Sequence, residues 1–179
     1  MQIVLIAGSN RSEATSTKLV RYMAAQLEVK GHEAIVIDLY QSQLPLYGPD
    51  SNEDNANVIR LKESVSSADA IVLATPEYHG SISGVLKNAL DYLSFEHVNN
   101  KVVLSVSSAG GAVGVSSLTH LQTMVRNLHG INCPEWVSIG GDLRQFTEEG
   151  KPQHANVIQR VNNTLDYFLK LAEQTRPLT

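Results

Sequence analysis

Residues 8–17 contain the first concentration of side chains that could do chemistry. They read G-S-N-R-S-E-A-T-S-T and combine five hydroxyl side chains with one cation, Arg11. A β-branched apolar run over 3–7 precedes them, and apolar residues at helical spacing follow over 19–27. The segment is therefore predicted to turn from a buried strand into a helix beginning near Ser16, whose N-terminal N–H groups face the turn. Hydroxyls, such N–H groups and a cation together favour a phosphate site.

Two common phosphate motifs do not fit this turn. A Walker A loop requires G-x-x-x-x-G-K-[ST], but Glu13 stands five residues after Gly8 and Thr17-Lys18 is in the wrong order. A dinucleotide fingerprint requires G-x-G-x-x-G, and Gly8 is the only glycine here. The remaining interpretations are a monophosphate site of the kind FMN needs, or an ordinary loop in which Ser16 or Thr17 caps the helix.

Composition limits the classes of protein and partner. The 179 residues are expected to form a single domain, 1–179, with 42% hydrophobic residues and a formal net charge of -4. No basic stripe suggests a nucleic-acid partner. One cysteine, Cys133, allows no intramolecular disulfide and is typical of a reducing compartment. No targeting segment and no apolar run of about 18 residues is visible, so we expect a cytoplasmic protein with no membrane partner.

Strand and helix patterns alternate along the chain. Strands are predicted over 3–7, 32–38, 70–75, 102–107 and 136–139, and helical spacing appears over 19–27, 58–68, 85–93, 118–128 and 157–172. A long irregular stretch covers 39–55. Five such units predict an α/β fold, a flavodoxin-like doubly wound five-stranded parallel sheet of order 2-1-3-4-5.

That topology places ligands outside the carboxyl ends of the strands, between the first and third strands. The turns that begin at Pro76 and Ser108 would then lie beside the first turn. Pro76 fixes the exit angle of its strand, and Gly80 permits a positive φ. The backbone N–H groups over 77–81 could face the heteroatoms of a ring, and Gly110 and Gly111 would let the backbone approach its edge. Ordinary turn formation and close helix packing are the alternatives for these two segments.

The sequence over 75–94, T-P-E-Y-H-G-S-I-S-G-V-L-K-N-A-L-D-Y-L-S, resembles the signature of NAD(P)H-dependent FMN reductases, usually P-E-Y-N-G-S-x-x-G-x-L-K-N-A-x-D-W. The first turn resembles the phosphate loop of that family, G-S-x-R-x-x-S, with one extra residue before Ser16. L-P-L-Y over 44–47 and S-S-A-G-G over 107–111 also match. The chain is most similar in these motifs to the azo-dye and quinone reductases of the family.

The resemblance implies a set of FMN-binding residues. Those for the phosphate are Ser9, Arg11, Ser16 and Thr17. Those bordering the isoalloxazine are Pro76, Glu77, Tyr78, His79, Gly80 and Ser81, and those on its pyrimidine side are Ser108, Gly110 and Gly111. His79 stands where Asn is usual, so its role is open between a flavin contact and a surface turn.

The resemblance also implies an enzyme in which NAD(P)H, as NADPH or NADH, reduces bound FMN and a small-molecule acceptor then reoxidises it, in ping-pong order. No protein nucleophile and no metal is required. Family members are commonly homodimers or homotetramers, with the helix over 85–93 at the interface. Three other functions remain open: a flavodoxin-type electron carrier, a reductase that uses FMN as substrate for a two-component oxygenase, and an interaction protein without a cofactor.

Overall fold

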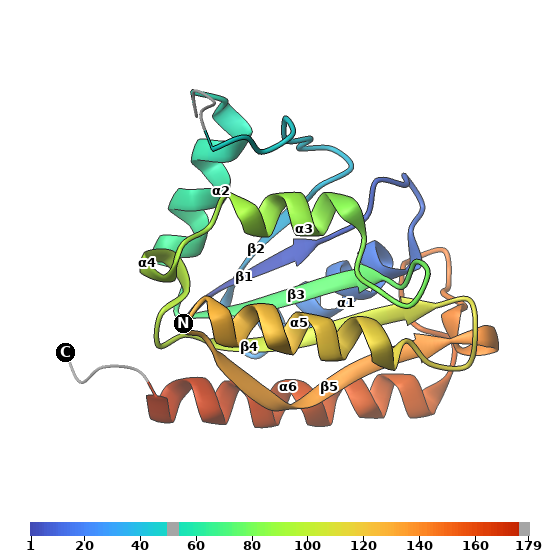
Figure 1. Cartoon of the computed structure of the whole chain (residues 1–179). Coiled ribbons are helices and arrows are strands. Elements are labelled where there is room, and N and C mark those ends of the chain that lie inside the picture. The colour runs from blue at the N-terminus through green and yellow to red at the C-terminus, as the bar shows by residue number, and fades with distance from the viewer. Residues whose placement is uncertain (50–53, 176–179) are drawn as a thin grey trace.

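The structure, a computed structural model, describes residues 1–49 and 54–175. Its centre is a parallel sheet of order β2-β1-β3-β4-β5 (Figure 1). The strands are β1 (Gln2–Ala7), β2 (Glu33–Asp38), β3 (Ala70–Pro76), β4 (Val102–Ala109) and β5 (Ile131–Gly140). The predicted fold class and strand order are confirmed.

Helices cover both faces of the sheet, as the buried strands require. The helices are α1 (Thr15–Val29), α2 (Ala56–Ser67), α3 (Gly84–Asp91), α4 (Phe95–Val98), α5 (Val115–Asn127) and α6 (Ala155–Thr175), with a 3-10 turn η1 (Gly141–Arg144). Alternate residues of β1 enter two cores: Ile3 and Leu5 pack with α1 and α6, and Val4 and Ile6 pack with α2 and α3. In Figure 1, α3 and α5 cross in front of the sheet and α1 lies behind it.

The last strand is longer than its pattern predicts. It begins at Ile131, five residues before the predicted start, and includes Pro134. The β4–β5 register shifts between Val103 and Ser105, which pair with Asn132 and Trp136. A proline without an N–H is tolerated in such a bulge on an edge strand. The prediction missed this half of β5 because Pro134 and its polar neighbours interrupt the apolar pattern.

The ends of β3, β4 and α3 also differ from the prediction. β3 includes Pro76, so Pro76 belongs to the strand and not to the turn after it. β4 continues to Ala109, so Ser108 belongs to the strand and not to the turn after it. The short helix α4 was not predicted, and α3 ends at Asp91, so Leu93 packs into the core from beyond the helix.

The irregular stretch after β2 is fastened to α3 over its described part, while residues 50–53 of the predicted loop lie outside the described residues. The Asn88 side chain accepts the Tyr47 backbone N–H at 2.8 Å and donates to the Pro45 carbonyl at 2.8 Å. The Tyr92 hydroxyl also donates to that carbonyl, at 3.2 Å, and the Tyr47 and Tyr92 rings meet edge to face at 5.1 Å. The L-P-L-Y motif is thus part of the packing of α3.

None of the helices formed by residues 1–49 and 54–175 has both the length and the apolarity needed to span a membrane.

Candidate flavin site

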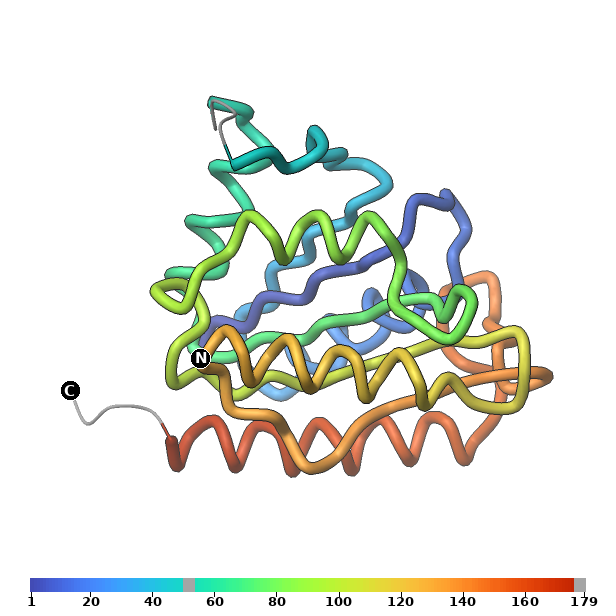
Figure 2. Tube along the Cα trace, viewed as in Figure 1, coloured from blue at the N-terminus to red at the C-terminus, as the bar shows by residue number. Residues whose placement is uncertain are grey.

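The turns after β1, β3 and β4 lie together at the carboxyl edge of the sheet, as the tube in Figure 2 shows. Backbone hydrogen bonds join them beyond the strands: Gly8 N–H donates to Ala74 O at 2.8 Å, and Glu77 N–H donates to Ser108 O at 2.8 Å. The three segments predicted to form one site are therefore brought to one edge.

Gly8 is required by the packing of α3 against the first turn. A Cβ at this position would lie 2.6 Å from Ala74 O and 2.7 Å from Leu86 Cβ. The Ser83 hydroxyl donates to Gly8 O at 2.6 Å and accepts the Leu86 N–H at 3.1 Å, so this N-cap of α3 also fastens the turn. Sequence reasoning missed Ser83, although its position just before an amphipathic helix is a recognisable cap signal.

Ser16 and Thr17 do not cap α1, which corrects the simpler interpretation of the first turn. The helix begins at Thr15, and its N-cap, Ala14, makes no side-chain hydrogen bond. Both hydroxyls lie within the first helical turn, in residues that are 0% and 1% exposed, and neither has a hydrogen-bond partner among the described residues. Since burial of an unpaired hydroxyl is costly, these atoms fit a ligand that brings oxygen acceptors, such as the phosphate of FMN.

The other predicted phosphate residues lie in the same loop. Ser9 is fully buried, and its hydroxyl accepts the Arg11 N–H at 3.2 Å, which shapes the loop. Arg11 is exposed, and no ion pair to it is formed within the part of the chain that the structure describes. Glu13 forms an ion pair with Lys18 at 2.9 Å, and the hydrogen bond and charge of Lys18 lower the pKa of the Glu13 carboxyl. Arg11 is thus the cation of this loop available to an anion.

The turn after β3 is a tight two-residue turn at His79 and Gly80. Tyr78 and Ser81 exchange backbone hydrogen bonds of 2.9 and 3.0 Å, and the central residues have φ values of 51° and 73°. Positive φ at both positions is the pattern of a type I′ turn. Because His, like Asn, enters the left-handed region more readily than most residues, the backbone explains why His79 can replace the usual Asn.

This geometry narrows which backbone groups could meet a ring. The N–H groups of Glu77, Tyr78 and Ser81 already donate within the protein, which leaves those of His79 and Gly80 from the predicted set. The Ser81 hydroxyl lies 2.9 Å from Nδ1 of His120 on α5, a neighbour that the sequence pattern did not suggest.

The turn after β4 is fixed at its base and open at its tip. Ser107 Oγ donates to Gly114 O at 2.9 Å, and Ser138 Oγ accepts the Gly114 N–H at 2.8 Å. A Cβ added at Gly110 or Gly111 would meet nothing within 4 Å, so packing inside the chain does not explain these glycines. Open space beside exposed backbone is what the approach of a flat ligand requires.

Comparison with known proteins identifies the family of the chain. The model of a family described as NADPH-dependent FMN reductase matches residues 1–143. The chain belongs to this family. This FMN reductase family member is accordingly an oxidoreductase that uses FMN and NAD(P)H, and its buried Ser16 and Thr17 hydroxyls suit the FMN phosphate. The assignment of individual residues to the flavin remains a prediction.

Its relatives include an FMN-dependent NADPH-azoreductase from Staphylococcus aureus, 36% identical over 143 residues, which are 77% of this chain and 76% of that protein. Among solved structures, the NAD(P)H:(acceptor) oxidoreductase FerB from Paracoccus denitrificans has a TM-score of 0.82 at 20% identity, covering 97% of this chain and 98% of that one. The apo form of the NADH:FMN oxidoreductase EMOB has a TM-score of 0.78 at 22% identity, covering 99% and 91%. At these identities the structures bear on the fold of this FMN reductase family member.

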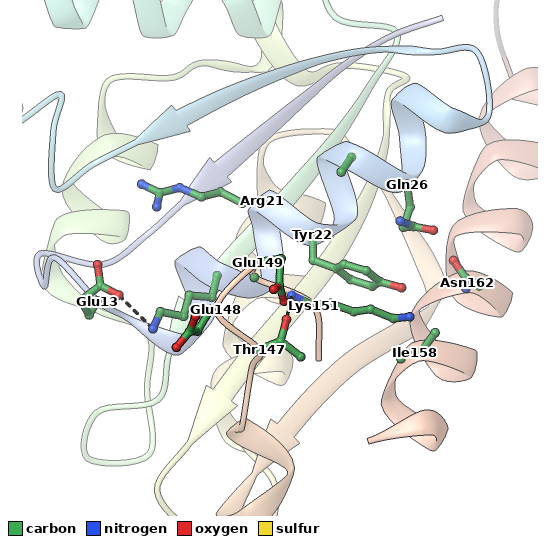
Figure 3. A pocket seen from close by; sticks show the side chains of 13 residues that line it. Glu13, Arg21, Tyr22, Gln26, Thr147, Glu148, Glu149, Lys151, Ile158 and Asn162 are labelled. Atoms are coloured by element: carbon green, nitrogen blue, oxygen red, sulfur yellow. Dashed lines mark hydrogen bonds and ion pairs between the residues drawn. The ribbon is translucent and has the colours of Figure 1, made fainter. Parts of the chain in front are cut away.

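Two cavities lie next to the first turn. One of about 280 Å³ is lined by Asn10, Leu39, Gln43, Leu44, Val85 and Asn88. Another of about 980 Å³ lies between α1, α6 and the loop at 147–151 (Figure 3). Its charged lining residues carry both signs, Glu13, Glu148 and Glu149 together with Lys18, Arg21 and Lys151, and Arg21 is itself paired with Asp38 at 2.8 Å. This mixture of charges does not favour the binding of an anion in the larger cavity.

Proposed function

We propose that this protein transfers electrons from NADPH, through FMN, to azo compounds, quinones or similar flat acceptors in ping-pong order. The observation that carries the proposal is the pair of buried hydroxyls of Ser16 and Thr17 in the predicted phosphate loop, which have no hydrogen-bond partner among residues 1–49 and 54–175. The azoreductase relative at 36% identity supports the acceptor class and the choice of NADPH.

FMN supplies the hydride chemistry when it is bound. Ser16, Thr17 and Arg11 would bind its phosphate, and the turn at 78–81 and the segment at 108–111, from the end of β4 into the following turn, would border its ring. Tyr78 is 38% exposed and Val113 56% exposed, so the rim of the site offers an aromatic and an apolar side chain. Such a rim favours flat, apolar molecules, and an open site lets nicotinamide and acceptor occupy the same face in turn.

We further propose a homodimer or homotetramer in the cytoplasm, with α3 at the subunit interface. Leu46, which is 87% exposed, lies in the segment fastened to α3 and supports an interface there. The single cysteine, buried and free, supports a reducing compartment. Sedimentation at several concentrations tests the oligomeric state, and a monomer throughout would contradict it.

Anaerobic titration of the FMN-loaded protein with NADPH tests the enzyme assignment. We expect prompt bleaching of the visible flavin bands, followed by recovery when a quinone or azo dye is added. Flavin that stays oxidised would favour an electron carrier, and FMN lost during gel filtration would favour FMN as a substrate. Parallel titration with NADH tests the choice of nucleotide.

Arg11→Ala tests the phosphate loop. Loss of a charge-assisted hydrogen bond, worth about 1.5 to 3 kcal/mol, should weaken FMN binding by about 10- to 150-fold. Fluorescence titration of the apoprotein measures the affinity. Arg60→Ala, an exposed cation on α2, is the matched control and should bind like wild type. Equal affinities for wild type and Arg11→Ala would contradict the role of this loop.

A further inference from the structure

Glu77 connects the two turns predicted to border the flavin ring. Its backbone N–H donates to Ser108 O at 2.8 Å, which extends the pairing of Pro76 with Ser108 between β3 and β4. Its carboxylate Oε2 accepts the Ser117 backbone N–H at 2.9 Å, in the first turn of α5. Backbone and side chain of Glu77 are therefore fixed to opposite ends of the same β4–α5 turn.

The carboxylate lies against the base of that turn. A Cβ built on Gly114, the N-cap of α5, would lie 3.3 Å from Glu77 Oε2. Within residues 1–49 and 54–175, no Lys or Arg forms an ion pair with Glu77. The side chain instead faces the positive end of the α5 dipole. There it accepts a hydrogen bond from one of the N–H groups that have no partner within a helix.

We propose that Glu77 is a positioning residue that also lowers the midpoint potential of bound FMN. The inference rests on the proposed placement of the ring over these turns. Hydride uptake adds one negative charge to FMN. A carboxylate fixed beneath the turn on the pyrimidine side repels that negative charge. The carboxylate also offsets the positive end of the α5 dipole, which would otherwise stabilise the charge. Glu77 therefore weakens the binding of reduced FMN relative to oxidised FMN.

Glu77→Gln separates charge from position, because the amide oxygen can still accept the Ser117 N–H and the side-chain volume is nearly unchanged. We expect the affinity for oxidised FMN to stay within about threefold of wild type. The ratio of affinities for reduced and oxidised FMN should rise about 3- to 10-fold, which for a two-electron couple is about 15 to 30 mV. Anaerobic reduction of the FMN-loaded protein against a reference dye measures the potential.

Two variants serve as controls. Glu77→Asp retains the charge and should keep the potential near the wild-type value, even if its shorter side chain weakens FMN binding. Glu63→Gln, on the exposed surface of α2, makes the same change in net charge away from the turns and should leave the potential unchanged.

The outcomes distinguish the role of Glu77 from the proposed function. A Glu77→Gln potential equal to or below that of wild type would overturn the inference while leaving the FMN site in place. If Glu77→Gln weakened the binding of oxidised and reduced FMN equally, the role of Glu77 would be structural only, and the inference would again be overturned. Failure of the wild-type apoprotein to bind FMN would overturn the FMN site itself, and the role of Glu77 with it.

Discussion

The Ser16 and Thr17 hydroxyls are polar atoms whose burial the protein alone does not explain. Each lies in the first turn of α1, beneath the loop that carries Arg11, with no partner among the described residues. Because buried polar groups usually have hydrogen-bond partners, this pair supports the proposal that a ligand supplies the missing hydrogen bonds.

Ser16→Ala should therefore affect stability and binding in opposite ways. Removing an unpaired buried hydroxyl leaves the apoprotein as stable as wild type or slightly more stable. FMN binding should weaken by about tenfold, because a hydrogen bond to a charged group is lost. Thermal unfolding of the apoprotein and fluorescence titration with FMN measure the two effects.

Ser66→Ala, an exposed position near the end of α2, provides the matched control and should change neither quantity. If Ser16→Ala destabilised the apoprotein and left FMN binding intact, the hydroxyl would have a structural partner and no ligand role.

Several contacts of individual residues at the site could not be predicted from the sequence. The resemblance named Glu77, but its bond to Ser117 depends on a neighbouring turn 40 residues away in the chain. Ser138 and His120 were missed for the same reason, since each meets its partner only after the strands align. Local pattern predicts what a residue can do, whereas these contacts depend on the register of β3, β4 and β5.

Among the elements, α3 and the first turn are packed so closely that Gly8 leaves no room for a side chain. Gly8→Ala should destabilise the protein by about 1 to 3 kcal/mol, because its Cβ would meet both backbone and the Leu86 side chain. Urea unfolding measures the change in free energy.

Gly84, at the start of α3, offers a matched control. A Cβ there would meet nothing within 4 Å, and its φ is not positive, so Gly84→Ala should be neutral or stabilise by up to about 1 kcal/mol. If Gly8→Ala were as stable as Gly84→Ala, the first turn and α3 could move apart without loss of folding free energy, and the prediction would be wrong.

The elements were predicted well where their apolar pattern is continuous and poorly where a turn or edge interrupts it. β1 and β3 are buried on both faces and read as unbroken apolar runs, so their positions and order followed from the sequence. α4 has only four residues, and the first half of β5 lies at a bulge, so neither gives a periodic signal long enough to detect, whereas the second half of β5 was predicted.

At the scale of the whole molecule, stability should depend on pH through His32. Burial, and then the charge of the Met1 amino group, lower the pKa of His32 below its ordinary value of 6.5. As pH falls through that value, the unfolded chain binds a proton before the native state does, so the free energy of unfolding decreases until the native His32 also titrates.

His32→Gln should remove part of that decrease. Urea unfolding at pH 7 and pH 5 gives the loss of stability for each protein, and we expect a smaller loss for the variant. A loss equal to that of wild type would assign the pH dependence to other groups.

The bulge at Pro134 also bears on how copies of this protein behave when crowded together. β5 is the outer strand on one side of the sheet, and an outer strand with free N–H and C=O groups can recruit a strand from another molecule. Pro134 is exposed, has no N–H to donate, and lies where the register shifts. We therefore expect the bulge, which also prevented prediction of the first half of β5, to hinder sheet extension and aggregation at this edge.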